Sequence, residues 1–217
     1  AGVSNVVAIA GGGYHSLALR ADGTVAAWGA GTNDTGGSPD FGQSLVPGGA
    51  TNVAAIAGGL YHSLAIRADG TVLAWGLDNN GQTDTPTGLT NGIAVAGGGY
   101  HSLVLEGDGS PYLTVQPFSR TAAAGATVVL AARAVGNQPL TYQWQCHGTN
   151  IPGATSALLT LPGVQATDAG TYAVVVSNRA GTLASRDAVL AVQAPRLIYI
   201  DSVAKLPDGR VELTING

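Results

Sequence analysis

One phrase recurs three times in this chain and constrains the fold more than any other feature. It reads GGGYHSLALRADGTVAAWG at residues 11–29 and GGLYHSLAIRADGTVLAWG at residues 58–76, and it begins again as GGGYHSLVLEGDGS at residues 97–110. The histidines of the phrase are His15, His62 and His101. Both intervals between them lie within the period of roughly 20–50 residues that is typical of a supersecondary unit laid down repeatedly.

Each copy has the pattern of short antiparallel β-strands. In the first copy, residues 15–20 have a strand-like pattern in which His15, Leu17 and Leu19 alternate with their neighbours, and residues 24–28 form a return strand that contains Trp28. Trp75 has the same place in the second copy. A further β-rich run precedes each histidine and predicts a third strand in each unit. These runs are residues 6–10, 53–57 and 93–96.

The two strands of each hairpin are separated by an aspartate and a glycine. Asp-Gly is favoured in two-residue turns of the primed type, in which both central residues need a positive φ. The sequence therefore predicts a primed turn in each copy, begun by Asp22, Asp69 and Asp108.

Over residues 3–110 the repeated phrase resembles the regulator of chromosome condensation repeat. The resemblance implies an all-β architecture in which each copy is one blade of a seven-bladed propeller, with the histidines, tryptophans and aspartates named above as its structural signature. Two blades and part of a third do not close such a ring, so we expect an open edge, a tendency to aggregate, and self-association through that edge. The second copy continues with Asn79-Asn80-Gly81-Gln82, whereas the first has residues 32–37, TNDTGG, where the family usually has Asn-x-x-Gly-Gln.

Residues 111–193 have a different pattern, which resembles an immunoglobulin-like β-sandwich. The resemblance implies that Trp144 is the buried tryptophan of the core and that Tyr172, in the sequence DAGTY, binds backbone upstream of it at a corner that contains Asp168. The cysteine pair of that family falls on Ala132 and Val174, so packing around the tryptophan must replace a disulfide. We also expect an ion pair between Asp168 and either Arg133 or Arg186.

The last part of the chain, residues 194–217, is predicted to be a linker at Ala194-Pro195 followed by one more hairpin. Its strands are expected at residues 197–200 and 211–215, joined through LPDGR at residues 206–210. An isolated hairpin is only marginally stable, so we interpret it as the opening of a further β domain, and the chain as a processed form or an excerpt of a longer one.

Composition excludes several classes of partner. The 217 residues carry a net charge of −4 and include a single lysine, Lys205, so the chain lacks the basic surface that nucleic acids and anionic membranes require. No apolar run approaches the length of about 18 residues that spans a bilayer. Cys146 is the one cysteine, which rules out an intrachain disulfide.

Three candidate sites each have a simpler structural interpretation. The three histidines could bind a metal only if they converged, and we favour a structural role in which each ring binds backbone. Residues 77–84, LDNNGQTD, faintly resemble a calcium loop but lack the glycine and glutamate of an EF-hand. Cys146 and His147 are neighbours on a strand, so their side chains diverge and do not form a nucleophile and base. We expect no catalytic residue, cofactor or metal.

These observations favour a non-catalytic interaction or adhesion module, extracellular or at the cell surface, as in modular bacterial proteins, with an unknown protein or glycan as partner. Three alternatives remain open. The chain could supply accessory domains of a larger secreted enzyme, act as an exchange factor for a small GTPase, which the net acidity disfavours, or, if complete as written, be a self-assembling structural subunit.

Overall fold

The computed structural model describes residues 3–194, 199–205 and 210–216, and nearly all of its regular structure is β-strand. Within these ranges the one helical element is a single 3₁₀ turn, η1 (Ala166–Asp168). The predicted all-β class is therefore confirmed. No helix in the described part of the chain is long and apolar enough to cross a membrane.

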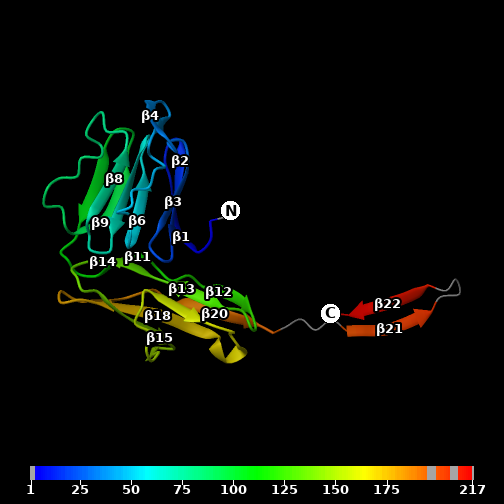
Figure 1. Cartoon of the computed structure of the whole chain (residues 1–217). Coiled ribbons are helices and arrows are strands. Elements are labelled where there is room, and N and C mark those ends of the chain that lie inside the picture. The colour runs from blue at the N-terminus through cyan, green and yellow to red at the C-terminus, as the bar shows by residue number, and fades with distance from the viewer. Residues whose placement is uncertain (1–2, 195–198, 206–209, 217) are drawn as a thin grey trace.

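The three copies of the repeated phrase fold into three successive antiparallel sheets, which lie side by side in Figure 1 and which we call blades 1, 2 and 3. Blades 1 and 2 each have three strands with the same register, whereas blade 3 has two. Blade 1 consists of β1 (Val6–Gly11), β2 (His15–Arg20) and β3 (Val25–Gly29). Blade 2 consists of β6 (Val53–Gly58), β7 (His62–Arg67) and β8 (Val72–Gly76). Blade 3 consists of β9 (Gly92–Gly97) and β10 (Ser102–Glu106).

The turn between β2 and β3 differs from the primed turn that the sequence predicts. Gly23 N–H donates to the Arg20 carbonyl and Arg20 N–H donates to the Thr24 carbonyl, both at 2.9 Å, so three residues lie between the paired ends of the strands. Gly23 has a φ of 84°, whereas Asp22 is not among the residues with positive φ. The prediction of a primed turn is therefore wrong, because one left-handed glycine after an ordinary turn closes the hairpin.

The aspartate of each turn has a different task from the one predicted. The Asp22 carboxylate accepts the backbone N–H of Thr24 at 2.9 Å and its hydroxyl at 2.7 Å. These bonds, led by the one from the hydroxyl, lower the pKa of Asp22. The backbone bond recurs from Thr71 to Asp69 and from Ser110 to Asp108. The aspartate therefore fixes the loop through its side chain and not through an unusual backbone angle.

A small hairpin, β4 (Asp34–Gly37) and β5 (Asp40–Phe41), is inserted between blades 1 and 2. It makes the first copy of the repeat longer than the second without changing the blades themselves. The blades pack on one another through an apolar cluster in which Leu17 and Leu19 of blade 1 meet Val53, Ala65 and Trp75 of blade 2.

Residues 112–193 form a sandwich of short strands around one core. Its largest sheet has the order β12-β20-β18-β15-β16, with β19 paired to β18, and two further pairs, β13-β17 and β11-β14, complete it. The strands are β11 (Tyr112–Val115), β12 (Arg120–Ala123), β13 (Val128–Ala131), β14 (Arg133–Val135), β15 (Thr141–Cys146), β16 (Thr149–Asn150), β17 (Leu158–Leu161), β18 (Gly170–Ser177), β19 (Thr182–Ala184) and β20 (Ala188–Gln193).

Trp144 lies at the centre of this core and is fully buried. Its indole N–H donates to the Ser156 carbonyl at 2.9 Å, which satisfies the one polar atom of the ring. Ala132 and Val174, where a disulfide would lie in the resembled family, are both 0% exposed and belong to the buried region. Apolar packing therefore occupies the place of the missing bridge.

The corner before β18 is held by hydrogen bonds between neighbouring residues. The Tyr172 hydroxyl donates to the Asp168 carbonyl at 2.8 Å, and the Asp168 carboxylate accepts the Gln165 backbone N–H at 2.7 Å. The expected ion pair of Asp168 with Arg133 or Arg186 is wrong. The Arg133 guanidinium instead donates to the Ala21 carbonyl of blade 1, and among the described residues the Asp168 carboxylate accepts the Gln165 N–H and forms no ion pair with Arg186.

The sandwich and the blades share buried surface. Strands β11 and β14 lie between the blades and the rest of the sandwich in Figure 1, and Val115 packs in the cluster between blades 1 and 2. Val135 packs with Ala54 and Ile66 of blade 2. Arg133 is 6% exposed, and its guanidinium donates to the Ala21 carbonyl of blade 1. Burial lowers the pKa of Arg133.

Beyond the sandwich, β21 (Tyr199–Lys205) and β22 (Val211–Asn216) form an antiparallel pair. The predicted final hairpin is therefore present, but its first strand continues to Lys205, beyond the predicted residues 197–200. The parts of that prediction that involve residues 195–198 and 206–209 lie outside the described residues.

Replacing Tyr172 by Phe tests the corner. The variant loses the hydrogen bond to the Asp168 carbonyl, and we expect the free energy of unfolding in urea to fall by about 0.5–1.5 kcal/mol. Tyr112→Phe is the control, because Tyr112 is exposed and its hydroxyl makes no hydrogen bond in the described structure. Equal stability of the two variants would contradict a structural role for the hydroxyl.

Candidate interaction site at the open end of the blade stack

A chain of hydrogen bonds joins each histidine of the repeat to the following blade. His15 of blade 1 is 4% exposed, and its Nε2 lies 2.8 Å from the Ser63 hydroxyl of blade 2. That hydroxyl donates to the Gln43 carbonyl at 2.8 Å. Since the hydroxyl hydrogen is used in this bond, Ser63 must accept from His15 Nε2–H. The neutral imidazole of His15 therefore carries its proton on Nε2.

The same arrangement joins blade 2 to blade 3. His62 is fully buried, its Nε2 lies 2.9 Å from the Ser102 hydroxyl, and Ser102 donates to the Gln82 carbonyl at 2.6 Å. The serine that directly follows each histidine thus binds the histidine of the preceding blade. The prediction that each imidazole binds backbone is wrong for these two rings, because a serine hydroxyl mediates the contact with the carbonyl.

Glycines before each histidine allow the blades to approach closely. A Cβ atom added at Gly58 would lie 2.7 Å from the Gly12 nitrogen of blade 1, and one added at Gly97 would lie 2.6 Å from the Gly59 nitrogen of blade 2. Backbone hydrogen bonds cross the same junctions, from Gly13 N–H to the Gly59 carbonyl at 3.0 Å for example. Any side chain at these glycines would force adjacent blades apart.

The glutamine of the first junction was not found by the sequence reasoning, which aligned residues 32–37 with Asn79-Asn80-Gly81-Gln82. Gln43 is the true counterpart of Gln82, because Gly42-Gln43 precedes His62 by the same interval as Gly81-Gln82 precedes His101. The misaligned residues lie in the inserted hairpin region instead. Counting backward from the next histidine, and not forward from the preceding tryptophan, would have revealed the match.

Aromatic side chains gather beside the histidines at the surface. The rings of Tyr14 and Tyr61 stack with centroids 5.2 Å apart and an interplanar angle of 7°, and Phe41 meets Tyr61 edge-on at 5.1 Å. Hydrogen bonding with Tyr61 raises the pKa of Tyr14. Tyr100, the equivalent residue of blade 3, is 51% exposed and has no such ring contact within the described structure.

Blade 3 ends the stack and lacks the partners that the other blades have. His101 is exposed, unlike the two preceding histidines, and Leu103 and Leu105 on β10 are each 60% exposed. No third strand pairs with β10 in the described part of the chain, because the backbone turns at Pro111 into β11, which pairs with β14 of the sandwich. The outer edge of β10 is therefore open.

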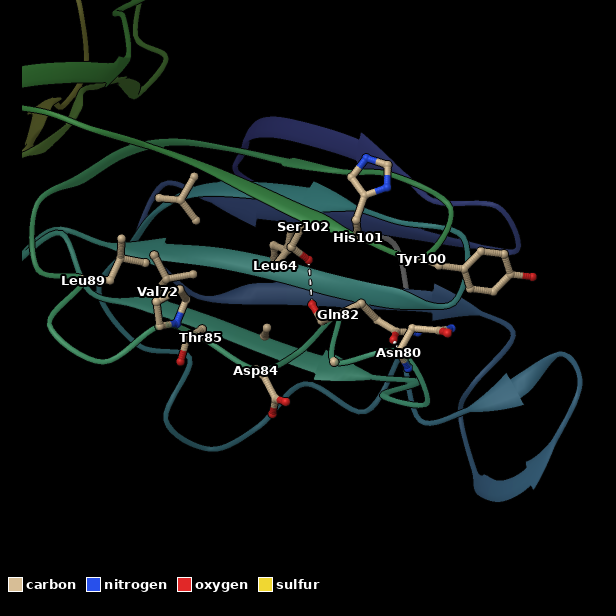
Figure 2. A pocket seen from close by; sticks show the side chains of 14 residues that line it. Leu64, Val72, Asn80, Gln82, Asp84, Thr85, Leu89, Tyr100, His101 and Ser102 are labelled. Carbon is tan, nitrogen blue, oxygen red and sulfur yellow. Dashed lines mark hydrogen bonds between the residues drawn. The ribbon is translucent and has the colours of Figure 1, made fainter.

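A hollow of about 320 Å³, which we call the terminal pocket, lies between blade 2 and β10. Its wall includes Leu64 and Ala74 of blade 2, Gln82 of the loop, and Ser102 and Val104 of β10. Figure 2 shows the bond from Ser102 to Gln82 within it, with Tyr100 and Leu89 toward opposite ends. The hollow is at the small end of the usual range for ligand pockets.

The other predicted residues have structural positions. Trp75 is 9% exposed and donates from its indole to the Gln43 carbonyl at 2.9 Å, whereas Trp28, which no earlier blade covers within the described residues, is 46% exposed. In the loop that faintly resembles a calcium site, the Asp78 carboxylate accepts Thr83 N–H at 2.9 Å. Among the described residues no group of three or more His, Cys, Asp or Glu side chains could hold a metal ion.

Cys146 and His147 are not a reactive pair in this structure. Cys146 is partly buried and packs against the sandwich core. His147 follows the end of β15 in a turn with a φ of 49°, and its backbone N–H donates to the Thr171 carbonyl at 2.8 Å.

Comparison with known families agrees with this division of the chain. A model of the regulator of chromosome condensation (RCC1) repeat matches residues 6–34 and 53–82, and an immunoglobulin domain model matches residues 110–178. The chain is thus an RCC1-type repeat region followed by an immunoglobulin-like domain, and the predicted resemblance is confirmed.

The curated relatives resemble only part of the chain. Contactin-2 of Homo sapiens is 38% identical over 71 residues, which is 29% of this chain and 7% of contactin-2. Kin of IRRE-like protein 1 of Homo sapiens is 35% identical over 95 residues, 43% of this chain and 12% of that protein. Cartilage intermediate layer protein 2 of Mus musculus is 35% identical over 107 residues, 45% of this chain and 9% of that protein. The chain therefore spans only a small fraction of these relatives.

Among solved structures, the I-band fragment I67–I69 from titin is 28% identical, covers 44% of this chain and 36% of its own, and has a TM-score of 0.38. Immunoglobulin domains 1–4 of Sidekick-1 are 31% identical, with coverage of 39% and 23% and a TM-score of 0.37.

Gly58→Ala tests the close approach of the blades. The added methyl group meets backbone of blade 1, and we expect the free energy of unfolding to fall by about 1–3 kcal/mol, as for other overpacked sites. Gly11→Ala is a matched control, because Gly11 has the same place in blade 1 and an added Cβ meets nothing within 4 Å. Urea unfolding followed by circular dichroism measures both, and equal stability of the two variants would contradict a close approach at Gly58.

Acid should weaken the junctions through the two buried histidines. Burial lowers the pKa of His15 and of His62 below the ordinary value of about 6.5. In each ring Nδ1 is buried without a hydrogen-bond partner, so a proton added there is unsatisfied. The unfolded chain binds these protons more readily. The stability that the neutral rings contribute is therefore fully present above about pH 6.5 and is lost as the pH falls below it toward the folded-state pKa.

Urea unfolding at about pH 7.5 and about pH 5 measures this loss. We expect the double variant His15→Gln/His62→Gln to lose less stability between the two pH values than the parent chain. The His101→Gln variant should lose as much stability between the two pH values as the parent chain, since His101 is exposed. An unchanged pH dependence in the double variant would assign the effect to other groups.

Proposed function

We propose that this chain is a non-catalytic interaction module of an extracellular or cell-surface protein and that it binds a protein partner through the open end of its blade stack. The observation that carries the proposal is the exposed apolar surface of β10, where Leu103 and Leu105 are each 60% exposed beside an unpaired strand edge. Exposed apolar surface next to an unpaired edge is typical of an interaction site.

The use of the histidines supports a non-catalytic role. His15 and His62 are the residues best suited to acid–base chemistry in the blades, and both are buried in bonds that join one blade to the next. Their neutral tautomers are needed for those bonds. A role in proton transfer would break the junctions on which the stack depends.

The names of the relatives support an extracellular location. One relative is the basement membrane-specific heparan sulfate proteoglycan core protein of Mus musculus, which is 39% identical over 75 residues, or 33% of this chain and 2% of that protein. Another is the cartilage intermediate layer protein described above. The resemblance lies in the kind of module and not in the whole of either protein, so it is also compatible with the alternative of accessory domains beside a catalytic domain.

Self-association is a second candidate, and the opposite end of the stack favours it. Ile9 on β1 of blade 1 is 79% exposed, so among the described blades both blade 1 and blade 3 present apolar side chains. A head-to-tail contact between two copies would cover Ile9 of one and Leu103 of the other. Such a contact is heterologous and repeats without closing.

The double variant Leu103→Glu/Leu105→Glu tests the proposal. We immobilise the full chain and measure binding to a panel of purified extracellular matrix proteins and glycans, and we measure its mass in solution by light scattering. The charged variant should lose at least tenfold in affinity for any bound protein, because the apolar surface is removed.

Leu45→Glu is the control, because Leu45 is 47% exposed on the loop between β5 and β6 and does not line the terminal pocket. Binding that both variants retain would refute a role for the open end. A concentration-dependent mass that the double variant abolishes would favour self-association over a separate partner. Acceleration of nucleotide release from a small GTPase would favour the exchange-factor alternative.

A further inference from the structure

We infer that the terminal pocket and the edge of β10 bind an extended segment of a partner protein that carries an aliphatic residue two positions before a tryptophan. The segment adds to blade 3 as its third strand and places its indole in the pocket. This inference rests on the proposed function and names the chemistry of the partner.

Blade 2 contains the occupied form of the same site. Its third strand, β8, pairs Trp75 with Ser63 and Leu73 with Ala65 of β7. The Trp75 indole N–H donates to the Gln43 carbonyl at 2.9 Å, and the Ser63 hydroxyl donates to the same carbonyl. The indole is thus both buried against blade 1 and hydrogen-bonded.

Blade 3 repeats this site without the tryptophan. Ser102 donates to the Gln82 carbonyl at 2.6 Å, as Ser63 does to that of Gln43. Within the described residues no indole reaches the Gln82 carbonyl, which keeps a lone pair for a second donor. Leu64 and Ala74 of the pocket wall occupy the places that Leu17 and Ala27 have at the preceding junction.

The described part of the chain does not itself fill the pocket. The shift in sequence that superposes His62 on His101 also superposes Leu73 on Tyr112 and Trp75 on Thr114. Tyr112 and Thr114 both lie in β11, which pairs with β14 of the sandwich. The residues that would complete blade 3 have therefore been used to begin the next domain.

The backbone of β10 is correctly oriented to accept a strand. Gly98 N–H donates to the His101 carbonyl at 2.9 Å, so the polar backbone groups of His101 face β9. Successive residues of a strand turn these groups to opposite sides. The N–H and C=O groups of Ser102 and Val104 therefore face the open edge. An added strand bonds to these groups, with its tryptophan opposite Ser102 and its aliphatic residue opposite Val104.

A second folded copy of the chain cannot supply this strand through its own exposed tryptophan. In blade 1, Gly12 N–H donates to the His15 carbonyl, so the backbone groups of His15 face β1. The backbone groups of the next residue, Ser16, therefore face β3, where Trp28 is its partner. The backbone groups of Trp28 are already used in that pairing. The occupant must therefore be a segment that is not yet part of a sheet, which favours an extended segment of another protein.

A peptide with the sequence of residues 71–76, TVLAWG, is the probe. It is labelled with fluorescein at its N-terminus, and its anisotropy is measured on titration with the full chain. We expect saturable binding, and at least a tenfold weaker affinity for TVLAAG, because that peptide cannot fill the pocket. A scrambled peptide of the same composition should not bind.

Val104→Arg places a charged side chain in the pocket and should weaken binding of TVLAWG at least tenfold. Leu45→Arg is the control, since it adds the same charge at an exposed loop residue that does not line the terminal pocket, and it should bind as the parent chain does. Thermal unfolding followed by circular dichroism shows whether Val104→Arg folds. If it does not fold, the comparison of TVLAWG with TVLAAG decides the question.

Equal binding of TVLAWG and TVLAAG, or no binding of either, would overturn the inference. In that event the proposed function stands if a protein partner from the panel still loses affinity on Leu103→Glu/Leu105→Glu, and it fails as well if no partner depends on that surface. Dimerisation of the full chain that TVLAWG cannot displace would overturn the inference in favour of a contact between copies.

Discussion

The blade stack depends on one set of contacts, the hydrogen bonds that run from a histidine through the serine of the next blade to a glutamine carbonyl. These bonds form only if adjacent backbones approach closely, and the glycines before each histidine make that approach possible. The bonds, the glycines and the packing of Trp75 at the same carbonyl all belong to the junction between blades. The repeated phrase therefore specifies how one blade binds its neighbour as much as how a single blade folds.

The sandwich is joined to the blades by shared core and not only by a linker. Val115 and Val135 are buried against blades 1 and 2, and Arg133 places a charge at the same interface, where it binds a backbone carbonyl of blade 1. Strands β11 and β14, which belong to the sandwich by sequence, thus cover the ends of the blades. This explains why blade 3 remains without a third strand: the chain has used those residues to attach the next domain.

The sequence was sufficient to predict the strands of the blades, the sandwich and its central Trp144, because alternation and motif spacing are local properties. The sequence did not predict the contacts between side chains that lie far apart in the chain. Nothing near His15 in the chain indicates Ser63 as its partner, and the inserted hairpin concealed Gln43. The turn at Gly23 was mistaken because Asp-Gly is compatible with more than one loop length. The terminal pocket could not be predicted, since it arises from the absence of a strand that the repeat otherwise supplies.

The direction of the hydrogen bonds between blades gives the stack a chemical polarity. Each bond donates from the earlier blade to the later one, so the two outer faces of the three described blades are not equivalent. Within the described residues His101 has no serine of a following blade, and Ser16 has no histidine of a preceding blade. If two stacks met through the same face, the imidazole donor of one would face the imidazole donor of the other, or the serine acceptor of one would face the serine acceptor of the other. A blade added to the stack, whether in evolution or by assembly, must therefore have the same orientation as the blade before it.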